Sequence, residues 1–338
     1  MKIEHQKSLK KYNTFGIDVK AKKFISINSE EELYEALTLC KDEDIFILSG
    51  GSNMLLTRDI DATVLHISIS GISVTEKTDN TVLVSANAGE NWHDFVQFCI
   101  DKGYGGLENL SLIPGYVGSA PIQNIGAYGV ELKDNFVSCE AIHTQTKEKR
   151  IFTKQDCNFG YRNSVFKNEL KGTYIITKVT FELTTAQHLL NTSYGAIEAA
   201  LKDKNCTKPT IKDIAEAVIS IRKSKLPDPS EIGNSGSFFK NPVISSTAFT
   251  VLQNTYPTIP SYKVDEKHIK VPAGWLIEQS GFKGKRWGDA GVHSKQALVL
   301  VNHNNATGKE ILELSLKIKE TVRQKFDISL ETEVNIIK

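Results

Sequence analysis

Two adjacent glycines that follow an apolar run are the first residues whose spacing suggests chemistry. Residues 45–48 are apolar, and residues 49–53 read Ser-Gly-Gly-Ser-Asn. Glycine tolerates positive φ, so successive backbone N–H groups in such a turn can point into one concavity and hold a phosphate. The alternative interpretation is an ordinary glycine turn, and the segment lacks the GxGxxG pattern of dinucleotide-binding domains. The turn at 49–53 is therefore a candidate phosphate site with an unidentified ligand.

A second unusual stretch covers residues 108–129, ENLSLIPGYVGSAPIQNIGAYG. Its four glycines stand among small residues and two prolines, a composition that suits backbone pressed closely against a flat ligand. We expect it to lack helix and strand, and a loop of this length is more often functional than a simple connection. The stretch makes a ligand-binding role for the turn at 49–53 the favoured interpretation.

Seven motifs then follow one another between residues 49 and 334: SGGSNMLL, ENLSLIPGYVGSAPIQNIGAYG, FGYRNSVFK, RKSKLPDP, GNSGSFFKNP, AGWLIEQSGFKG and LETEV. Each alone could arise by chance, but their joint order across nearly the whole chain is specific. Together they resemble the MurB family, the UDP-N-acetylenolpyruvoylglucosamine reductases of peptidoglycan synthesis.

The resemblance implies an α+β fold of the vanillyl-alcohol-oxidase (PCMH) type, with a two-part FAD-binding region and a separate α+β substrate domain. We expect residues 1–70 and 328–338 to form the first FAD-binding subdomain, residues 71–225 the second, and residues 226–327 the substrate domain. Two prolines after a helical pattern, at positions 227 and 229, mark the boundary between residues 225 and 226. FAD would lie between the two subdomains, covered by residues 49–57 and 110–129.

The resemblance also implies the reaction, which is NADPH-dependent reduction of UDP-N-acetylglucosamine enolpyruvate to UDP-N-acetylmuramate. Hydride would pass from flavin N5 to the terminal enolpyruvyl carbon. The FAD contacts implied in this way are Ser49, Gly50, Gly51, Ser52, Asn53 and Met54 in the turn, and Leu112, Ile113, Pro114, Gly115, Gly118, Ser119, Gln123, Asn124, Gly126 and Ala127 in the loop.

Three residues match the catalytic positions of the family. Arg162 would grip the substrate carboxylate, since a guanidinium stays charged and binds a carboxylate through two hydrogen bonds. Ser237 would donate the proton, and Glu333 would assist beside the developing negative charge, which requires a raised pKa. Without the resemblance, these would be a surface arginine, a turn serine and an exposed strand residue.

The substrate-binding residues are likewise implied by family position. Lys225 and Asn241 would stabilise the Ser237 alkoxide, and Lys283 and Gln296 would bind the UDP diphosphate. The remaining candidates are Tyr161, Tyr194 and Arg222. Tyr194 matches the tyrosine that closes over the nucleotide in type I members, and Arg222 could instead simply favour a helix C-terminus. The chain departs from the family at Asn335, where many members carry arginine.

The elements that position these residues follow from capping and periodicity. Ser29, Asn91, Thr210 and Thr307 each precede apolar residues at helical spacing, which predicts four amphipathic helices. Short β-branched or alternating segments predict strands at residues 24–27, 45–48, 64–67, 82–86, 174–183, 297–301 and 334–337. Because helices do not follow every strand, the pattern favours an α+β fold over a doubly wound sheet.

Composition narrows the protein class. The 338 residues carry a formal net charge of +1, which gives no field for steering onto nucleic acid. We find no signal sequence and no apolar run of transmembrane length, and therefore expect a cytoplasmic protein that contacts no membrane. The five cysteines are widely spaced without CxxC, so we expect reduced packing residues rather than a disulfide frame or a metal site. We expect a monomer that acts on small molecules.

Two other functions remain open at this point. An oxidase on the same flavin fold would share the flavin loops without Arg162, Ser237 and Glu333. A nucleotide-sugar binding protein without flavin would be the second. The sequence carries no separate dinucleotide-binding fingerprint, which favours NADPH and the UDP-sugar using one cleft in turn, with ping-pong kinetics.

Overall fold

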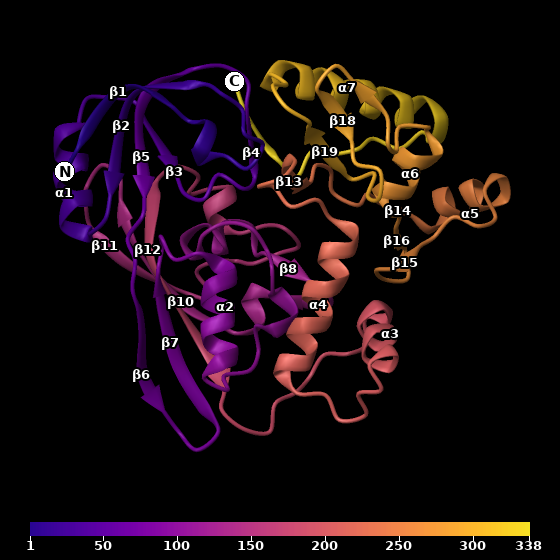
Figure 1. Cartoon of the computed structure of the whole chain (residues 1–338), viewed down its shortest axis with the longest axis horizontal. Coiled ribbons are helices and arrows are strands. Elements are labelled where there is room, and N and C mark those ends of the chain that lie inside the picture. The colour runs from indigo at the N-terminus through magenta and orange to yellow at the C-terminus, as the bar shows by residue number, and fades with distance from the viewer. The chain divides into compact units, whose positions relative to one another are not determined.

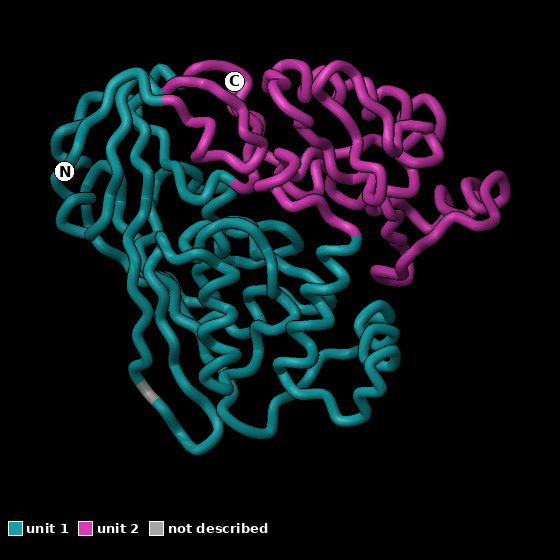
Figure 2. Tube along the Cα trace, in the orientation of Figure 1, with its two compact units in different colours: residues 1–7, 21–51, 60–224 teal, residues 8–20, 52–59, 225–338 magenta. Residues whose placement is uncertain are grey.

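Helices and strands are interspersed along the whole chain, as the computed structural model shows (Figure 1). The structure describes residues 1–75 and 77–338. The chain divides into two compact units, coloured separately in Figure 2. Unit 1 contains residues 1–7, 21–51 and 60–224, and unit 2 contains residues 8–20, 52–59 and 225–338. Each unit is described by itself.

The first sheet of unit 1 is held by one amphipathic helix. Its strand order is β1 (Ile3–Ser8), β2 (Lys20–Ile27), β5 (Ile60–Ile67) and β3 (Ile45–Leu48). Strands β2 and β3 both run parallel to β5. Helix α1 (Glu30–Leu39) begins at Ser29, whose hydroxyl accepts a hydrogen bond from the backbone N–H of Glu32. The helix buries Leu33, Ala36 and Leu37 in an apolar cluster with β2 and β5.

The second sheet of unit 1 is antiparallel. Its order is β11 (Lys149–Thr153), β10 (Phe136–His143), β12 (Tyr174–Thr184), β7 (Thr81–Asn87) and β6 (Ile72–Lys77). Helix α2 (Trp92–Asp101) packs on this sheet, with the rings of Trp92 and Phe95 against Phe181. Helix α4 (Ile211–Lys225) adds Ile211 and Ala215 to the same core. Helix α3 (Gly195–Asp203) packs on α4 through a smaller apolar cluster.

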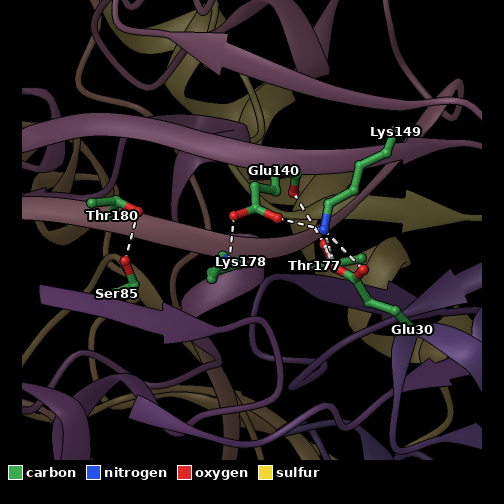
Figure 3. Close-up of polar contacts among 7 residues, drawn as sticks. All are labelled: Glu30, Ser85, Glu140, Lys149, Thr177, Lys178 and Thr180. Atoms are coloured by element: carbon green, nitrogen blue, oxygen red, sulfur yellow. Dashed lines mark hydrogen bonds and ion pairs between the residues drawn. The ribbon is translucent and has the colours of Figure 1, made fainter. Parts of the chain in front are cut away.

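A charged network fastens α1 to the second sheet (Figure 3). Lys149 Nζ lies 2.8 Å from a carboxylate oxygen of Glu30 and 2.5 Å from one of Glu140. Glu140 also pairs with Lys178, and Thr177 donates a hydrogen bond of 2.7 Å to Glu30. Burial raises the pKa of Glu140, but its hydrogen bonds with the two lysines outweigh burial and lower it. The two sheets of unit 1 are thus joined by compensated charges as well as by apolar packing.

Unit 2 is built on a four-stranded antiparallel sheet. Its order is β13 (Gly233–Ser237), β19 (Val299–Asn302), β18 (Ala290–Val292) and β17 (Arg286–Trp287). Helix α7 (Gly308–Phe326) begins with a capping box of Thr307 and Glu310, and it packs on β18 and β19. The other elements are β4 (Met54–Leu56) parallel to β20 (Asn335–Ile337), the small sheet of β14 (Val243–Ser245), β16 (His268–Lys270) and β15 (Tyr262–Lys263), and helices α5 (Ser246–Thr255) and α6 (Ala273–Gln279).

The structure confirms the α+β class and the four predicted helices. Strands form at all seven predicted segments, although β19 begins at Val299 rather than at residue 297. Cys99, Cys139 and Cys157 lie in the core of unit 1, as expected for packing residues. The three-domain division stays a prediction. Within residues 1–75 and 77–338, no helix has the length and apolar content needed to cross a membrane.

The expectation of a loop without helix or strand at residues 108–129 was wrong. The stretch contains the short 3-10 helices η2 (Glu108–Leu110), η3 (Val117–Ser119) and η4 (Pro121–Gln123), and β8 (Gly126–Ala127) pairs with β9 (Val130–Glu131). Buried Leu110 and Val117 anchor these turns in the core, and Pro121 stands in the first turn of η4, where its fixed φ suits a helix start. The apolar residues that are unusual for a loop are therefore the ones that hold these short helices in the core.

Candidate functional site

The turn at residues 49–53 has the features of an anion site. Gly51 adopts a left-handed φ of 58°. The hydroxyl of Ser49 is buried and has no hydrogen-bond partner within the part of the chain that the structure describes. A Cβ on Gly50 would lie 3.0 Å from Gly115 Cα and 3.1 Å from the backbone N of Tyr116, so the turn packs directly against the loop. An unpaired buried hydroxyl beside tightly packed backbone fits the pyrophosphate of FAD.

The loop is held by its own side chains. Asn124 is fully buried with a left-handed φ of 45°, and its amide donates to Gly160 O and Glu131 Oε2 at 3.0 Å each. Its side-chain oxygen accepts from the backbone N–H of Lys133. Both N–H groups of this amide and its oxygen are thus engaged inside the protein. Ser119 likewise donates its hydroxyl to Tyr116 O at 2.8 Å.

Arg162 lies against the loop. Its own φ is 52°, and its Nη2 donates to Gly126 O at 2.6 Å. Its guanidinium carbon lies 5.5 Å from the ring centre of Tyr161. A Cβ on residue 126 would lie 3.0 Å from Arg162 Nη1. Glycine at this position therefore leaves room for the guanidinium. The structure therefore places a cation at the end of the candidate FAD loop.

Arg222 reaches the same loop from helix α4. Its Nε donates to Leu112 O at 3.2 Å, and it is also hydrogen-bonded to Tyr128. Burial lowers the pKa of Arg222, with Tyr128 opposing the shift. The Tyr128 ring in turn packs edge-on against Tyr194, with ring centres 5.3 Å apart. Arg162, Arg222 and Tyr194 are therefore all attached to the loop within unit 1, and Arg222 is a loop anchor as much as a substrate candidate.

Ser237 lies in unit 2, at the end of strand β13. A register shift between Asn234 and Ser237 opens the pairing with β19, and Gly236 takes a φ of 67° there. Buried Asn234 accepts a hydrogen bond from the Gly236 N–H at 3.0 Å, which fixes the irregularity. Ser237 is therefore a strand residue that follows an irregularity of bulge type, and not a turn serine.

Glu333 runs beside the segment that follows Ser237. Its backbone N–H donates to Phe238 O at 2.9 Å, and Phe239 bridges Thr332. Asn335 is hydrogen-bonded to the carbonyl of Asn53 through both its backbone N–H and its side-chain Nδ2, at 3.2 and 2.9 Å. Unit 2 therefore brings the Ser237 and Glu333 segments together, next to the half of the turn that it contains.

The remaining candidates of unit 2 gather mainly around α6. Asn241 Oδ1 accepts from the first N–H of that helix, at Ala273, and Gln296 Oε1 lies 3.0 Å from the position of a Cβ on Gly274. Lys283 pairs with Glu278 of the same helix at 2.8 Å. Lys225 is exposed at the end of α4. The predicted UDP-binding residues Lys283 and Gln296 thus both lie against α6.

Two polar residues of unit 1 escaped the sequence analysis. Asn109 donates to the carbonyls of Tyr128 and Asn191 and so ties the loop to the segment before Tyr194. His93 accepts a hydrogen bond from the backbone N–H of Leu112. Asn109 lies within the motif at residues 108–129, but the motif does not show which backbone groups it binds. His93 lies outside the motifs, and its local signal is its position in the first turn of a helix capped by Asn91.

Comparison with known proteins agrees with this geometry. The family model for the C-terminal domain of UDP-N-acetylenolpyruvoylglucosamine reductase matches residues 228–337, and that for a FAD-binding domain matches residues 21–150. A UDP-N-acetylenolpyruvoylglucosamine reductase of Flavobacterium johnsoniae is 57% identical over 337 residues, covering 100% of both chains. One of Pseudomonas putida is 46% identical and covers 98% of each chain.

A solved structure agrees as well. UDP-N-acetylenolpyruvylglucosamine reductase (MurB) from Thermus caldophilus superimposes with a TM-score of 0.69, at 25% identity, over the full length of both chains. Sequence identity of 57% over the full length goes well beyond a shared fold. The chain belongs to the MurB family of UDP-N-acetylenolpyruvoylglucosamine reductases.

Proposed function

We propose that Arg162, Ser237 and Glu333 are the catalytic residues of the reaction that this chain, as a UDP-N-acetylenolpyruvoylglucosamine reductase, catalyses. The reaction is the FAD-dependent, NADPH-driven reduction of UDP-N-acetylglucosamine enolpyruvate to UDP-N-acetylmuramate. The observation that supports the assignment of residues is that Ser237 follows a strand irregularity and that the next residue, Phe238, accepts a hydrogen bond from the backbone N–H of Glu333. The proposed setting is the cytoplasm, and the proposed active species is a monomer.

The FAD site is assigned to the turn and the loop. Ser49, Gly50 and Gly51 supply the buried hydroxyl and the compact backbone for the pyrophosphate. Residues 112–127 supply backbone, because the side chains of Ser119 and Asn124 are engaged inside the protein. When bound, FAD accepts hydride from NADPH and passes it to the substrate.

Arg162 binds the substrate carboxylate. Hydride addition at the terminal enolpyruvyl carbon leaves negative charge on the neighbouring carbon, which is delocalised into that carboxylate. A guanidinium stabilises such charge with two parallel hydrogen bonds and cannot lose its proton. Its bond to Gly126 O and its contact with Tyr161 fix the direction in which the remaining N–H groups point.

Ser237 delivers the proton that completes the reaction. A serine hydroxyl is a weak acid, so its alkoxide needs neighbouring hydrogen-bond donors, a role we assign to Lys225 and Asn241. Glu333 assists in its protonated form, since a second negative charge beside the intermediate would oppose the reaction; its raised pKa stays a prediction. Lys283 and Gln296 bind the UDP diphosphate, and Tyr194 closes over the nucleotide. NADPH and the UDP-sugar use the site in turn.

The experiment that tests this proposal separates the two half-reactions in Ser237→Ala. We expect flavin reduction by NADPH to keep the wild-type rate, while reduction of the enolpyruvyl group falls by about 10²–10⁴-fold, the size of a lost general acid. Both rates are followed anaerobically by the flavin absorbance. Ser246→Ala, which removes a hydroxyl at the start of α5, is the matched control and keeps both rates. Equal damage to both half-reactions in Ser237→Ala would show that the serine is structural.

A further inference from the structure

Leu112 is held at both ends of its backbone by side chains from two different helices. It adopts a left-handed φ of 60°, a conformation that disfavours residues with a side chain. Its N–H donates to Nδ1 of His93 on α2 at 3.0 Å. Its carbonyl accepts from Nε of Arg222 on α4 at 3.2 Å. Strained backbone persists only where its surroundings fix it, and these two bonds do so.

The bond from Leu112 defines the protonation state of His93. Nδ1 can accept a hydrogen bond only while it carries no proton, so the imidazole must be neutral with its proton on Nε2. Burial lowers the pKa of His93 below its ordinary value of 6.5. Lys223 and Arg222 on α4 lower it further, whereas Asp94 on α2 opposes them. The ring also stands in the first turn of α2, where the positive end of the helix dipole disfavours imidazolium.

We propose that His93 is a positioning residue for FAD, which shapes the cofactor loop at Leu112 and makes FAD affinity depend on pH. The inference rests on the proposed function, in which residues 112–127 hold the cofactor. Protonation of His93 turns its Nδ1 into a donor that faces the Leu112 N–H, and the left-handed turn then loses one of its two anchors. A lowered pKa means that the anchor is present at neutral pH and is lost as pH falls through that lowered value.

Two variants separate the acceptor role from packing. His93→Asn keeps an acceptor near the place of Nδ1 and does not titrate, whereas His93→Leu keeps bulk without any acceptor. Dissociation constants for FAD are measured by flavin fluorescence from about pH 8 to about pH 5 for the wild type and both variants. Thermal denaturation of each apoprotein shows whether the fold is retained.

At neutral pH, we expect His93→Leu to bind FAD about 3- to 10-fold more weakly than the wild type, because one hydrogen bond is lost. We expect His93→Asn to bind FAD as tightly as the wild type. Towards acid, the wild-type affinity falls to that of His93→Leu, while His93→Asn stays tight. His66, which stacks on Phe24, is present in all three proteins. Any effect of its titration on FAD affinity is therefore the same in each and does not alter the differences between them.

Equal affinities in all three proteins, or an acid-sensitive His93→Asn, would overturn the role of His93 alone and leave the proposed function standing. If His93→Leu does not fold, the FAD affinities of the wild type and His93→Asn across the pH range still show whether His93 causes the pH dependence. A wild-type protein without affinity for FAD would overturn this inference together with the proposed function.

Discussion

The two units hold their candidate residues by different means. In unit 1, the loop has backbone bonds such as that of the Gly118 N–H to Ala88 O, and in addition side chains bind its carbonyls: Arg162 at Gly126, and Arg222 at Leu112. In unit 2, the Ser237 and Glu333 segments are held mainly by backbone hydrogen bonds, with β19 and with each other, and one side chain, Asn234, fixes the irregularity at Gly236. Backbone pairing survives a change of side chain, whereas a side-chain anchor does not.

This difference predicts how each region responds to substitution. In unit 1, a single side chain can serve both chemistry and loop shape, so its removal weakens cofactor binding as well as turnover. In unit 2, backbone hydrogen bonds hold the segments that carry Ser237 and Glu333, the side chains proposed for catalysis. Substitutions there should change rates without changing stability.

Arg162→Gln should have the largest effect of the changes that test this comparison. We expect kcat/KM for the enolpyruvyl substrate to fall about 10- to 150-fold, since a hydrogen bond to a charged group contributes about 1.5–3 kcal/mol. FAD affinity falls as well, because the bond to Gly126 O is lost. Steady-state kinetics and fluorescence titration measure the two effects.

The control for this substitution is Arg150→Gln. Arg150 pairs with Asp156 at the surface of β11, at 3.0 Å, and has no role in the proposed site. It should leave kinetics and FAD affinity unchanged. A loss as large as that of Arg162→Gln would refute a specific role for Arg162.

Gly118→Ala tests how tightly the loop is seated on its own unit. A Cβ at this position would lie 2.4 Å from Ala88 Cβ, and the Gly118 N–H is already bonded to Ala88 O. Because the loop cannot retreat without losing that bond, we expect about 1–3 kcal/mol of destabilisation and a lower Tm. Gly195→Ala, where the new Cβ meets nothing within 4 Å, is the control in calorimetry. The same Tm for both variants would contradict the close packing.

Asn335→Ala should have the smallest effect and tests the backbone-held region. The substitution removes the side-chain bond to Asn53 O but keeps the backbone N–H bond to the same atom and the pairing of β4 with β20. We expect FAD to bind no more than about 3- to 10-fold more weakly, the loss of one hydrogen bond. Complete loss of FAD binding would show that unit 2 also depends on side-chain anchors.

Local sequence signals predicted local structure well. Ser29, Asn91 and Thr307 cap the helices that they were predicted to begin, because a cap involves only the next three residues. The 3-10 helices of the loop were missed, since they depend on burial of Leu110 and Val117 in a core assembled from distant strands.

The candidate site was predictable only in part. The motifs named Arg162 and Arg222, but not that each binds a loop carbonyl, an interaction that joins residues 36 and 110 positions apart. His93 belongs to none of the seven motifs, and Asn109 lies in one without any sign of its partners; both roles become visible only in the folded chain. Sequence patterns record residue types at fixed spacing, whereas these anchors are set by tertiary packing.

The central claim is that this chain passes electrons from NADPH through FAD to an enolpyruvyl group, and a single-turnover experiment tests it most directly. The holoprotein is reduced anaerobically with one equivalent of NADPH, separated from nucleotide, and mixed with UDP-N-acetylglucosamine enolpyruvate. The account predicts rapid return of the oxidised flavin spectrum and a product that has gained two hydrogen atoms. Flavin that stays reduced until oxygen is admitted would contradict the account and indicate an oxidase instead.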